Sequence, residues 1–452
     1  MSDTIAAVST GTQVCAIGIV RLSGSAAIDI ADKLFAPVSG AKMSGSADRK
    51  LCYGRLHDAE GRLLDICLCT VSRAPNSYTG EDTAEFQCHG SPVVLRAVLE
   101  AAFALGARQA LPGEFTKRAF LNGRMDLSSA EAVADIIDAE TAEAARNAAG
   151  QLGGAISRRI DGIYRVLTDI SSHYHAVLDY PDEDIEDFTI SRYKDDIARC
   201  TETLERLRAS YDSGRLMHAG VPAAIVGRPN AGKSSLLNAL LGYDRAIVTD
   251  IPGTTRDTIE EKLRLGGVLL RLTDTAGIRE TSDEIERQGV SRSRRAMQEA
   301  ELVIAVIDGS RELTAGDAEL IKCAERAPHG IVVLSKLDLG RSSALPETAL
   351  PVVELSSVTG EGLAALGDTV RGLFPLPCAP AGEILTNARQ FDAVSRALES
   401  MKAASEALGL GCTPDIVLTE TETAMSALGE LTGRTVREEV TNRIFERFCV
   451  GK

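Results

Sequence analysis

The sequence of 452 residues lacks the signals of a membrane or secreted protein. No apolar run is long enough to cross a bilayer. The N-terminus has neither the basic, apolar and small-residue pattern of a secretory signal nor the Arg-rich pattern of a transit sequence. The ten cysteines include no CxxC pair, which argues against a disulfide framework and a zinc ribbon. We therefore expect a cytoplasmic protein with reduced thiols and no membrane contact.

An excess of positive charge is also missing. The chain has 49 lysines and arginines against 64 aspartates and glutamates, a net charge of −15. A protein that binds nucleic acid by itself usually carries a basic face. If RNA is a partner, a local basic patch or a second protein must therefore offset the repulsion. The histidines indicate no metal pair, because His173 and His175, two positions apart, do not share a helix face.

The length and a hydrophobic fraction of 44% indicate about three domains with ordinary cores. Residues 1–120 have a mixed α/β pattern, with strands expected at Ala16–Leu22 and Asp65–Val71 and a helix at Ser91–Leu105. Residues 128–178 are helical in pattern, with apolar residues every three or four positions. The expected buried stripe consists of Ile156, Ile160, Ile163, Leu167, Ile170, Tyr174 and Val177.

Residues 220–373 alternate apolar strands with helical patterns, as in a doubly wound α/β domain. A proline-rich break at 375–380 follows, and the rest of the chain is helical again. The helical segments on either side could form one bundle with the α/β domain inserted into it. The expected strands of the α/β domain are Ala223–Val226, Val268–Thr273, Leu302–Ile307, Ile331–Leu334 and Val352–Leu355.

A glycine-bounded loop, Gly227–Ser234, lies between an apolar strand and a helical pattern. Its backbone N–H groups can wrap a phosphate, and the helix N-terminus adds partial positive charge. Lys233 can reach the β- and γ-phosphates, and the Ser234 hydroxyl can hold Mg²⁺. The sequence therefore predicts a nucleotide site, to which we assign Asn230, Ala231, Gly232, Lys233, Ser234 and Ser235.

Further motifs at strand ends make this a guanine-nucleotide site. Asp274 can hold the Mg²⁺ shell, the Gly277 amide can meet the γ-phosphate, and Gly253–Asp257 resembles a switch loop. Asp338 can accept two hydrogen bonds from N1 and N2 of guanine, which adenine cannot offer. Taken in this order, the motifs are specific to GTPases. They assign to GTP the residues Thr254, Thr255, Asp274, Thr275, Ala276, Gly277, Ser335, Lys336, Asp338, Ser356, Ser357 and Val358.

Position 278 holds Ile, where Ras-type enzymes have the Gln that orients the attacking water. Another group must therefore position the water, and three glutamates just downstream are candidates: Glu280, Glu284 and Glu286. Their plainer explanation is an exposed helix start. No arginine finger is evident from the sequence, and Arg256 and Arg279 stay open for that role.

Two polar segments of the N-terminal part, and one cysteine, contain potential functional groups. Residues 77–90 suit a binding loop beside a short strand, although a solvated hairpin is the plainer explanation. Residues 112–127 gather basic side chains in an otherwise acidic chain. Cys449 is a candidate nucleophile for carbon 6 of a pyrimidine, with packing behind an apolar helix as the alternative.

Together these stretches resemble the MnmE (TrmE) family of tRNA-modification GTPases over essentially the whole chain. The resemblance implies an N-terminal α+β tetrahydrofolate-binding and dimerisation domain at 1–120 and a P-loop GTPase domain at 218–376. The latter is inserted in a helical domain formed by 121–217 and 377–452. The resemblance rests on Asp3–Ile5, Gly18–Gly24, Ser77–Gly90, Pro112–Leu127, Gly227–Ser235, Thr249–Asp257, Asp274–Glu280, Thr386–Arg389 and Phe448–Lys452.

The resemblance also implies a folate site. It would take 5,10-methylene-tetrahydrofolate, or 5-formyl-tetrahydrofolate as an analogue. A carboxylate can pair with the N–H edge of the pterin, and cations can pair with the glutamate tail. The residues implied are Arg21, Glu85, Arg124 and Lys452.

By the same resemblance, potassium activates the GTPase and supplies the positive charge that an arginine finger gives elsewhere. Mg²⁺ would be held by Ser234 and Thr255. Glu286 would position the water, with Lys233 as the other catalytic residue. The implied K⁺ ligands are Asn230, Thr249, Ile251 and Thr254, of which Thr249 would also contact GTP.

The implied partners are a second copy of the chain, tRNA, and the FAD-dependent protein MnmG (GidA) in a heterotetramer. The two proteins would build a carboxymethylaminomethyl or aminomethyl group on carbon 5 of the tRNA wobble uridine. Methylene-tetrahydrofolate would donate the carbon, and glycine or ammonium the nitrogen. GTP hydrolysis would drive the nucleotide domains together and apart.

The chain departs from the family pattern at three places. Ser335 replaces the usual Asn, which weakens one contact to guanine, and Ser357-Val358 replaces the usual Ala-Lys. Residues 8–13 lack the usual proline. Two other functions stay open: a GTP-dependent ribosome-assembly switch, and a folate-dependent methyltransferase acting alone through Cys449. Residues 77–90 and 112–127 argue against the first, because a ribosome factor has no need of them.

Overall fold

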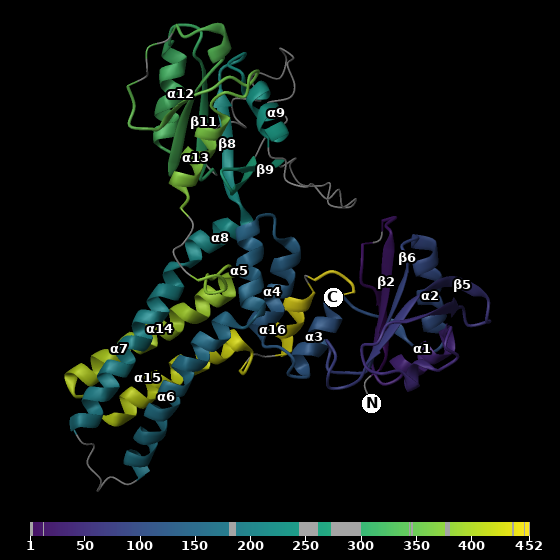
Figure 1. Ribbon diagram of the computed structural model, residues 1–452. Helices are drawn as coiled ribbons and strands as arrows, with labels where there is room; N and C mark the ends of the chain where they lie inside the picture. The colour runs from purple at the N-terminus through teal and green to yellow at the C-terminus, as the bar shows by residue number, and fades with distance from the viewer. Residues whose placement is uncertain are drawn as a thin grey trace. The chain divides into compact units, whose positions relative to one another are not determined.

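The computed structural model (Figure 1) describes residues 3–11, 13–179, 187–243, 261–272, 300–342, 344, 347–375, 380–435, 438–446 and 448–451. Its contacts divide the chain into two compact units. The first consists of Met1–Ala134, Gly150–Cys200 and Arg396–Lys452, and the second of Asp135–Ala149 and Thr201–Ser395. Among the described residues, no helix combines the length and apolar character that crossing a membrane requires.

The first unit contains a seven-stranded sheet. All neighbouring strands are antiparallel except β1 and β7, which are parallel. Helices α1 (Ala27–Leu34) and α2 (Pro92–Ala104) pack on one face, where Val20, Phe86 and Val98 belong to the same core. The strand order is β3 (Phe35–Pro37), β4 (Cys52–His57), β5 (Leu63–Ser72), β6 (Thr83–His89), β2 (Ile17–Ser23), β1 (Ile5–Val8) and β7 (Arg108–Gln109).

Strand periodicity separates the two faces of this sheet. Along β2, Val20 and Leu22 are buried in the core, while Arg21 between them lies on the opposite face and is half-buried. The predicted strands at 16–22 and 65–71 and the predicted helix at 91–105 are confirmed as β2, β5 and α2. Strands β1, β3, β4 and β7 were not predicted.

One helix of the first unit confirms the predicted apolar stripe, except at Val177, whose side chain lies outside the described residues. Helix α6 (Ala155–Asp179) packs against α15 (Pro414–Thr432), and the stripe residues from Ile156 to Tyr174 are at most 4% exposed. The remaining helices of this part, some of which continue into the second unit, are α3 (Glu114–Leu121), α4 (Leu127–Asp138), α5 (Ala142–Leu152), α7 (Asp187–Ala209), α14 (Ala388–Leu410) and α16 (Glu438–Phe445).

The second unit contains a doubly wound α/β sheet, drawn in teal and green in Figure 1. Strands β8, β10, β11, β12 and β13 pair in parallel, and β9 closes one edge as an antiparallel hairpin with β10. The order is β13 (Val352–Glu354), β12 (His329–Ser335), β11 (Leu302–Asp308), β8 (Val221–Gly227), β10 (Val268–Leu272) and β9 (Glu261–Leu265).

Apolar side chains are buried on both faces of this sheet, as a parallel sheet requires. All seven residues of β11 are buried. The five predicted strands are confirmed, except that Thr273 lies outside the described residues. The helices are α8 (Tyr211–Ala219), α9 (Lys233–Tyr243), α12 (Ala315–Glu325) and α13 (Leu363–Leu373).

A buried group of charges ties the start of the chain to α3. The Arg118 guanidinium, 10% exposed, donates to carboxylates of Asp3 at 2.7 Å, Glu81 at 2.9 Å and Glu114 at 3.0 Å. Burial disfavours ionised Glu114, but hydrogen bonds from Arg108, a backbone amide and Arg118 outweigh it and lower the pKa of Glu114. This stabilisation is therefore present above its ordinary pKa of 4.5 and lost as the pH falls through the lower folded-state value.

Replacing Arg118 with Ala should unfold this part of the chain more readily. Glu81 and Glu114, whose side chains are 14% and 11% exposed, would lose their central cation. We expect a loss of about 3–5 kcal/mol in the free energy of unfolding, measured by denaturant titration. The exposed Arg55→Ala serves as the control and should change stability by less than about 0.5 kcal/mol. Equal effects of the two substitutions would contradict the role given to Arg118.

Candidate functional site

The phosphate loop begins where β8 ends and stops where α9 begins at Lys233. A Cβ atom at Gly227 would lie 2.5 Å from the Val306 carbonyl oxygen, so no larger residue fits there. Asn230 and Gly232 have φ of +59° and +97°, left-handed values that turn the chain sharply back into the helix. Asn230 is exposed at the tip of the turn. This strand, loop and helix N-terminus have the geometry of a phosphate site.

Lys233 bends back over the loop. Its ammonium group donates hydrogen bonds to the carbonyl oxygens of Gly227 at 2.7 Å and Arg228 at 2.9 Å. Burial lowers the pKa of Lys233, because water no longer stabilises its charge fully. The two carbonyl contacts hold the cation within the loop, so the structure places positive charge where the sequence predicts phosphate binding.

Ser335, which stands where GTPases usually have Asn, is hydrogen-bonded to the phosphate loop. It is the last residue of β12 and is 1% exposed. Its hydroxyl lies 2.6 Å from the Ala231 carbonyl oxygen and 3.0 Å from that of Ile307, and can donate its hydrogen to either. The hydroxyl therefore ties the phosphate loop to the ends of β11 and β12.

The two segments predicted to read guanine are joined directly. The Ser356 hydroxyl, after β13, donates to a carboxylate oxygen of Asp338 at 2.6 Å. The same hydroxyl oxygen accepts from the backbone N–H of Val358 at 3.3 Å. Asp338 is exposed, and Lys336 pairs with Asp308 at 2.7 Å. The structure thus presents a fixed, open carboxylate at this end of the sheet, next to the exposed Val358 and the half-buried Ser357.

Arg21 and Glu85 form the corresponding pair in the N-terminal part. They lie directly opposite each other on β2 and β6, and their side chains meet at 2.7 Å. The Arg21 guanidinium lies over the rings of Tyr78, 5.5 Å from its centroid, and Phe115, at 5.7 Å. The side chains of Arg21 and Glu85 are 20% and 27% exposed. The structure therefore brings together two of the residues predicted for folate.

Of the other two residues predicted for folate, Arg124 adjoins the same region, and Lys452 lies outside the described residues. The Arg124 side chain lies against the loop at Gly80, where an added Cβ would be 3.2 Å from its Cγ. The Cys449 carbonyl accepts from the Gly113 amide at 3.3 Å, and Gly451 accepts from the Ser9 hydroxyl at 3.0 Å. The C-terminal tail therefore docks on the N-terminal part, with Cys449 exposed. No contact of the described residues supplies Cys449 with a general base, so its role as a nucleophile stays a prediction.

Several predicted site residues lie outside the described residues, and their assignments stay predictions. They include the switch and potassium residues, the water-positioning glutamate and the C-terminal lysine. They are Thr249, Ile251, Thr254, Thr255, Arg256, Asp274, Thr275, Ala276, Gly277, Arg279, Glu280, Glu284, Glu286 and Lys452.

Sequence reasoning missed the polar groups that hold the loop at 77–82. The Ser23 hydroxyl donates to Glu81 at 2.7 Å and lies 2.7 Å from the Thr79 hydroxyl. Glu81 is also held by Arg118. The gathering of basic residues at 112–127 was noticed in the sequence, but nothing there indicated that one of them would be buried among carboxylates.

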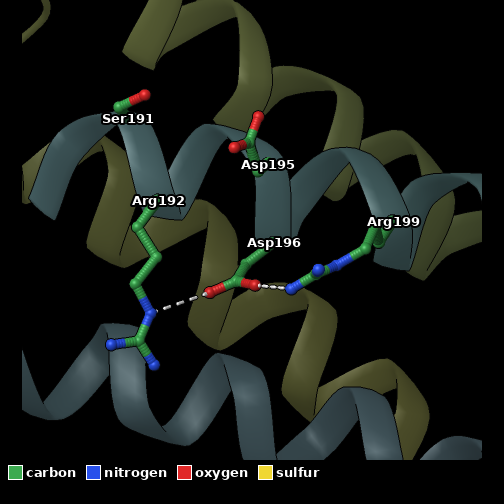
Figure 2. Close-up of a pocket in the computed structure, with 5 residues that line it drawn as sticks. All are labelled: Ser191, Arg192, Asp195, Asp196 and Arg199. Carbon is green, nitrogen blue, oxygen red and sulfur yellow. Dashed lines mark hydrogen bonds and ion pairs between the residues drawn. The ribbon is translucent and has the colours of Figure 1, made fainter. Parts of the chain in front are cut away.

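Two surface cavities of about 330 and 290 Å³ are lined by charged side chains and contain none of the predicted site residues. The first has Arg158, Asp161, Arg165 and Arg434 in its wall, with Arg434 paired to Asp161 at 2.8 Å. Figure 2 shows the second, on α7, where Asp196 lies between Arg199 and Arg192, the latter at 3.7 Å. The second wall holds two arginines and two aspartates, whereas the first holds three arginines and one aspartate.

The parallel sheet, the phosphate loop with its lysine, and the carboxylate at the end of β12 define a P-loop GTPase. The N-terminal and helical parts narrow the class further. Residues 127–449 match the family model "MnmE helical domain", and residues 4–124 match "GTP-binding protein TrmE N-terminus". The chain belongs to the MnmE family of tRNA modification GTPases.

Relatives confirm this membership over the full length. The tRNA modification GTPase MnmE of Roseiflexus sp. (strain RS-1) is 43% identical over 464 residues, covering 100% of this chain and 99% of the relative. The protein of that name from Symbiobacterium thermophilum is 43% identical over 458 residues, with the same coverage of each chain. That of Lactococcus lactis subsp. cremoris (strain MG1363) is 40% identical and is covered to 98%.

Changing Asp338 to Asn should exchange guanine for xanthine as the preferred base. The carboxylate accepts N–H groups of guanine, whereas an amide NH₂ can donate to the second carbonyl of xanthine. We expect the affinity for GTP to fall roughly a hundredfold and that for xanthosine triphosphate to rise, measured with fluorescent nucleotides. The amide oxygen can still accept from Ser356, so the loop should persist. The control is Asp368→Asn at an exposed position of α13, and a continued preference for GTP in D338N would contradict the assignment.

Proposed function

We propose that this GTPase acts in the modification of the wobble uridine of tRNA, together with an FAD-dependent partner of the MnmG (GidA) type. What supports this is the match, over the full length of the chain, to family members named as tRNA modification GTPases. The product would be an aminomethyl or carboxymethylaminomethyl group on carbon 5, built with a folate-borne carbon and with glycine or ammonium as the nitrogen source.

The nucleotide chemistry follows from the groups at the ends of the parallel strands. Loop amides and Lys233 would bind the β- and γ-phosphates, and Asp338 would select guanine. Lys233 would exchange its two carbonyl contacts for phosphate oxygens, a rotation of one side chain. Glu286 would orient the attacking water toward the γ-phosphate. In this scheme the chain supplies positioning and charge, which is most of what phosphoryl transfer requires.

The phosphate loop has oxygen donors that suit two cations. Ser234, exposed in the first turn of α9, offers a hydroxyl oxygen for Mg²⁺, with Thr255 as the second protein ligand. Asn230, exposed at the left-handed turn, offers an amide oxygen for K⁺, with Thr249, Ile251 and Thr254 as the other ligands. A potassium ion bound there would supply the positive charge that other GTPases take from an arginine.

The Arg21–Glu85 pair fits the head of a reduced folate. The Glu85 carboxylate is oriented by Arg21 at 2.7 Å, so it can accept hydrogen bonds from the N–H edge of a pterin. The ring of Tyr78, 37% exposed and beside Arg21, provides flat apolar surface for the pterin, whereas Phe115 on the same guanidinium is fully buried. Arg124 and Lys452 would hold the glutamate tail. The same N-terminal part would form the homodimer, and the pair of chains would bind two partner chains in a heterotetramer.

GTP turnover should depend on potassium. We expect hydrolysis to be about tenfold faster or more in K⁺ than in Na⁺ at equal ionic strength, since the ion replaces an arginine finger. Asn230→Ala should remove most of the difference while leaving nucleotide affinity within about threefold. The matched control is Asn76→Ala, at an exposed position of the N-terminal part. Equal rates in the two salts for the unaltered protein would exclude the potassium mechanism.

Folate binding should depend on the carboxylate of Glu85. We expect Glu85→Gln to weaken the binding of 5-formyl-tetrahydrofolate about tenfold in calorimetry, the loss of one charge-assisted hydrogen bond. GTP hydrolysis should be unchanged. Glu60→Gln, which alters an exposed carboxylate, is the matched control. Unaltered folate affinity in E85Q would remove Glu85 from the site.

The pathway itself is tested by mass spectrometry of tRNA nucleosides from a strain lacking the gene. We expect the wobble uridines of a subset of tRNAs to lose their carbon-5 substituent and to regain it when the gene is restored. Restoration with a Cys449→Ser gene distinguishes the methyltransferase alternative, which requires that thiol. Unchanged tRNA with defective ribosomal particles would favour the ribosome-assembly switch instead.

A further inference from the structure

A group of metal-ligating side chains lies in the N-terminal sheet, apart from the predicted nucleotide and folate residues. Asp65 and Cys67 of β5 and Cys88 of β6 offer ligand atoms that all lie within 4.8 Å of one another. The two cysteines are 5% and 1% exposed, and the Asp65 side chain is 10% exposed. Both thiols are recorded as free.

Strand pairing creates this group. Residues 65 and 67 are two apart on β5 and so lie on the same face of the sheet. The antiparallel pairing of Leu68 with Gln87 makes Cys67 and Cys88 the next pair along, side by side on the core face. A slip of one residue would move one thiol to the other face, so the register alone brings the sulfurs together.

Core packing accounts for the thiols but not for the carboxylate. A buried free cysteine packs as a small apolar side chain. The carboxyl group of Asp65 beside them requires polar partners. Its Oδ1 accepts from the Ile66 amide at 2.7 Å and lies 2.8 Å from the His89 ring nitrogen, and its Oδ2 accepts from the His89 amide at 2.8 Å. Among the contacts of the described residues, Oδ2 keeps one lone pair, and the other bonds fix the direction of the carboxylate.

We propose that Asp65, Cys67 and Cys88 form a binding site for one thiophilic divalent cation of the zinc type. Two thiolates and a carboxylate are zinc ligands, and the sulfurs exclude magnesium and calcium. Tetrahedral zinc requires sulfurs about 3.8 Å apart, which side-chain rotation can reach from the observed spacing. His89, 76% exposed and already beside Asp65, can continue to hold the carboxylate while the cation is bound.

The bound cation would join β5 to β6 at the end where β6 leads into α2. Glu85, three residues before Cys88 on β6, faces the other side of the same sheet. The cation would therefore stabilise the strand that carries the Arg21–Glu85 pair without touching that pair. Its binding involves no nucleotide and no folate, so it is tested independently of the proposed function.

Cobalt titration of the reduced, metal-free full-length protein tests this site. We expect one Co²⁺ per chain to bind with a thiolate-to-cobalt charge-transfer band and tetrahedral d–d bands, and Zn²⁺ to displace it. Cys67→Ala and Cys88→Ala should each weaken Co²⁺ binding about tenfold or more and reduce the band, and Asp65→Asn should weaken it about tenfold. Cys15→Ala and Cys412→Ala, which alter exposed thiols, are the matched controls.

A second measurement starts from the unaltered protein. Zn²⁺ should raise the melting temperature of the unaltered protein, and this shift should disappear in Cys67→Ala while persisting in Cys412→Ala. No charge-transfer band in the unaltered protein, or an undiminished band in both buried-cysteine variants, would overturn the proposal. A disulfide would also overturn the proposal. It would appear in the metal-replete, unaltered protein as an intact mass lower by two hydrogens and as a link between Cys67 and Cys88 in the peptide map.

Discussion

The nucleotide site depends on the parallel alignment of strands β8, β11, β12 and β13. Parallel strands end at the same edge of a sheet, so the phosphate loop and both guanine segments emerge side by side although they are distant in sequence. Two hydroxyls then fix their positions. Ser335 joins the phosphate loop to β12, and Ser356 joins the segment after β13 to Asp338. These bonds are buried or half-buried, where a hydrogen bond holds geometry without competition from water.

In the N-terminal part, ion pairs take the place of the hydroxyl hydrogen bonds that fix the loops of the α/β sheet. Arg118 pairs with three carboxylates, two of which also pair with Arg108, and the third, Glu81, also accepts from Ser23. On the sheet face beside it, Arg21 orients Glu85. In both parts a carboxylate predicted to bind a ligand is held by a polar side chain, Asp338 by Ser356 and Glu85 by Arg21.

The sequence was sufficient for elements with strong local patterns. The five predicted parallel strands and the stripe of α6 carry continuous or regularly spaced apolar residues, and all of them were found where expected. Strand β9 was missed because Glu261–Leu265 mixes charged and apolar residues as an edge strand does. The phosphate loop was recognised because phosphate binding requires glycines, a lysine and a serine at this fixed spacing.

Long-range pairing accounts for what the sequence could not supply. Ser335 looked like a weakened guanine contact, and only its burial beneath Ala231 reveals a structural role. Cys67 and Cys88 are separated by 21 positions (88 − 67), and their contact depends on the register of two strands. Absence of a CxxC pair therefore excluded a zinc ribbon but not a site built across strands. The burial of Arg118 likewise depends on acids from three different segments.

The packing of α6 against α15 has a consequence for how the chain folds. Residues 180–413, which include the whole α/β sheet, separate these two helices along the chain. Closure entropy grows only with the logarithm of loop length, by about 0.6 kcal/mol for each doubling, so lengthening the intervening segment costs the helical pair little further equilibrium stability. The kinetic effect is larger, because contacts between distant segments form late. Until α15 is in place, the apolar stripe of α6 lacks its cover, and uncovered apolar surface favours aggregation.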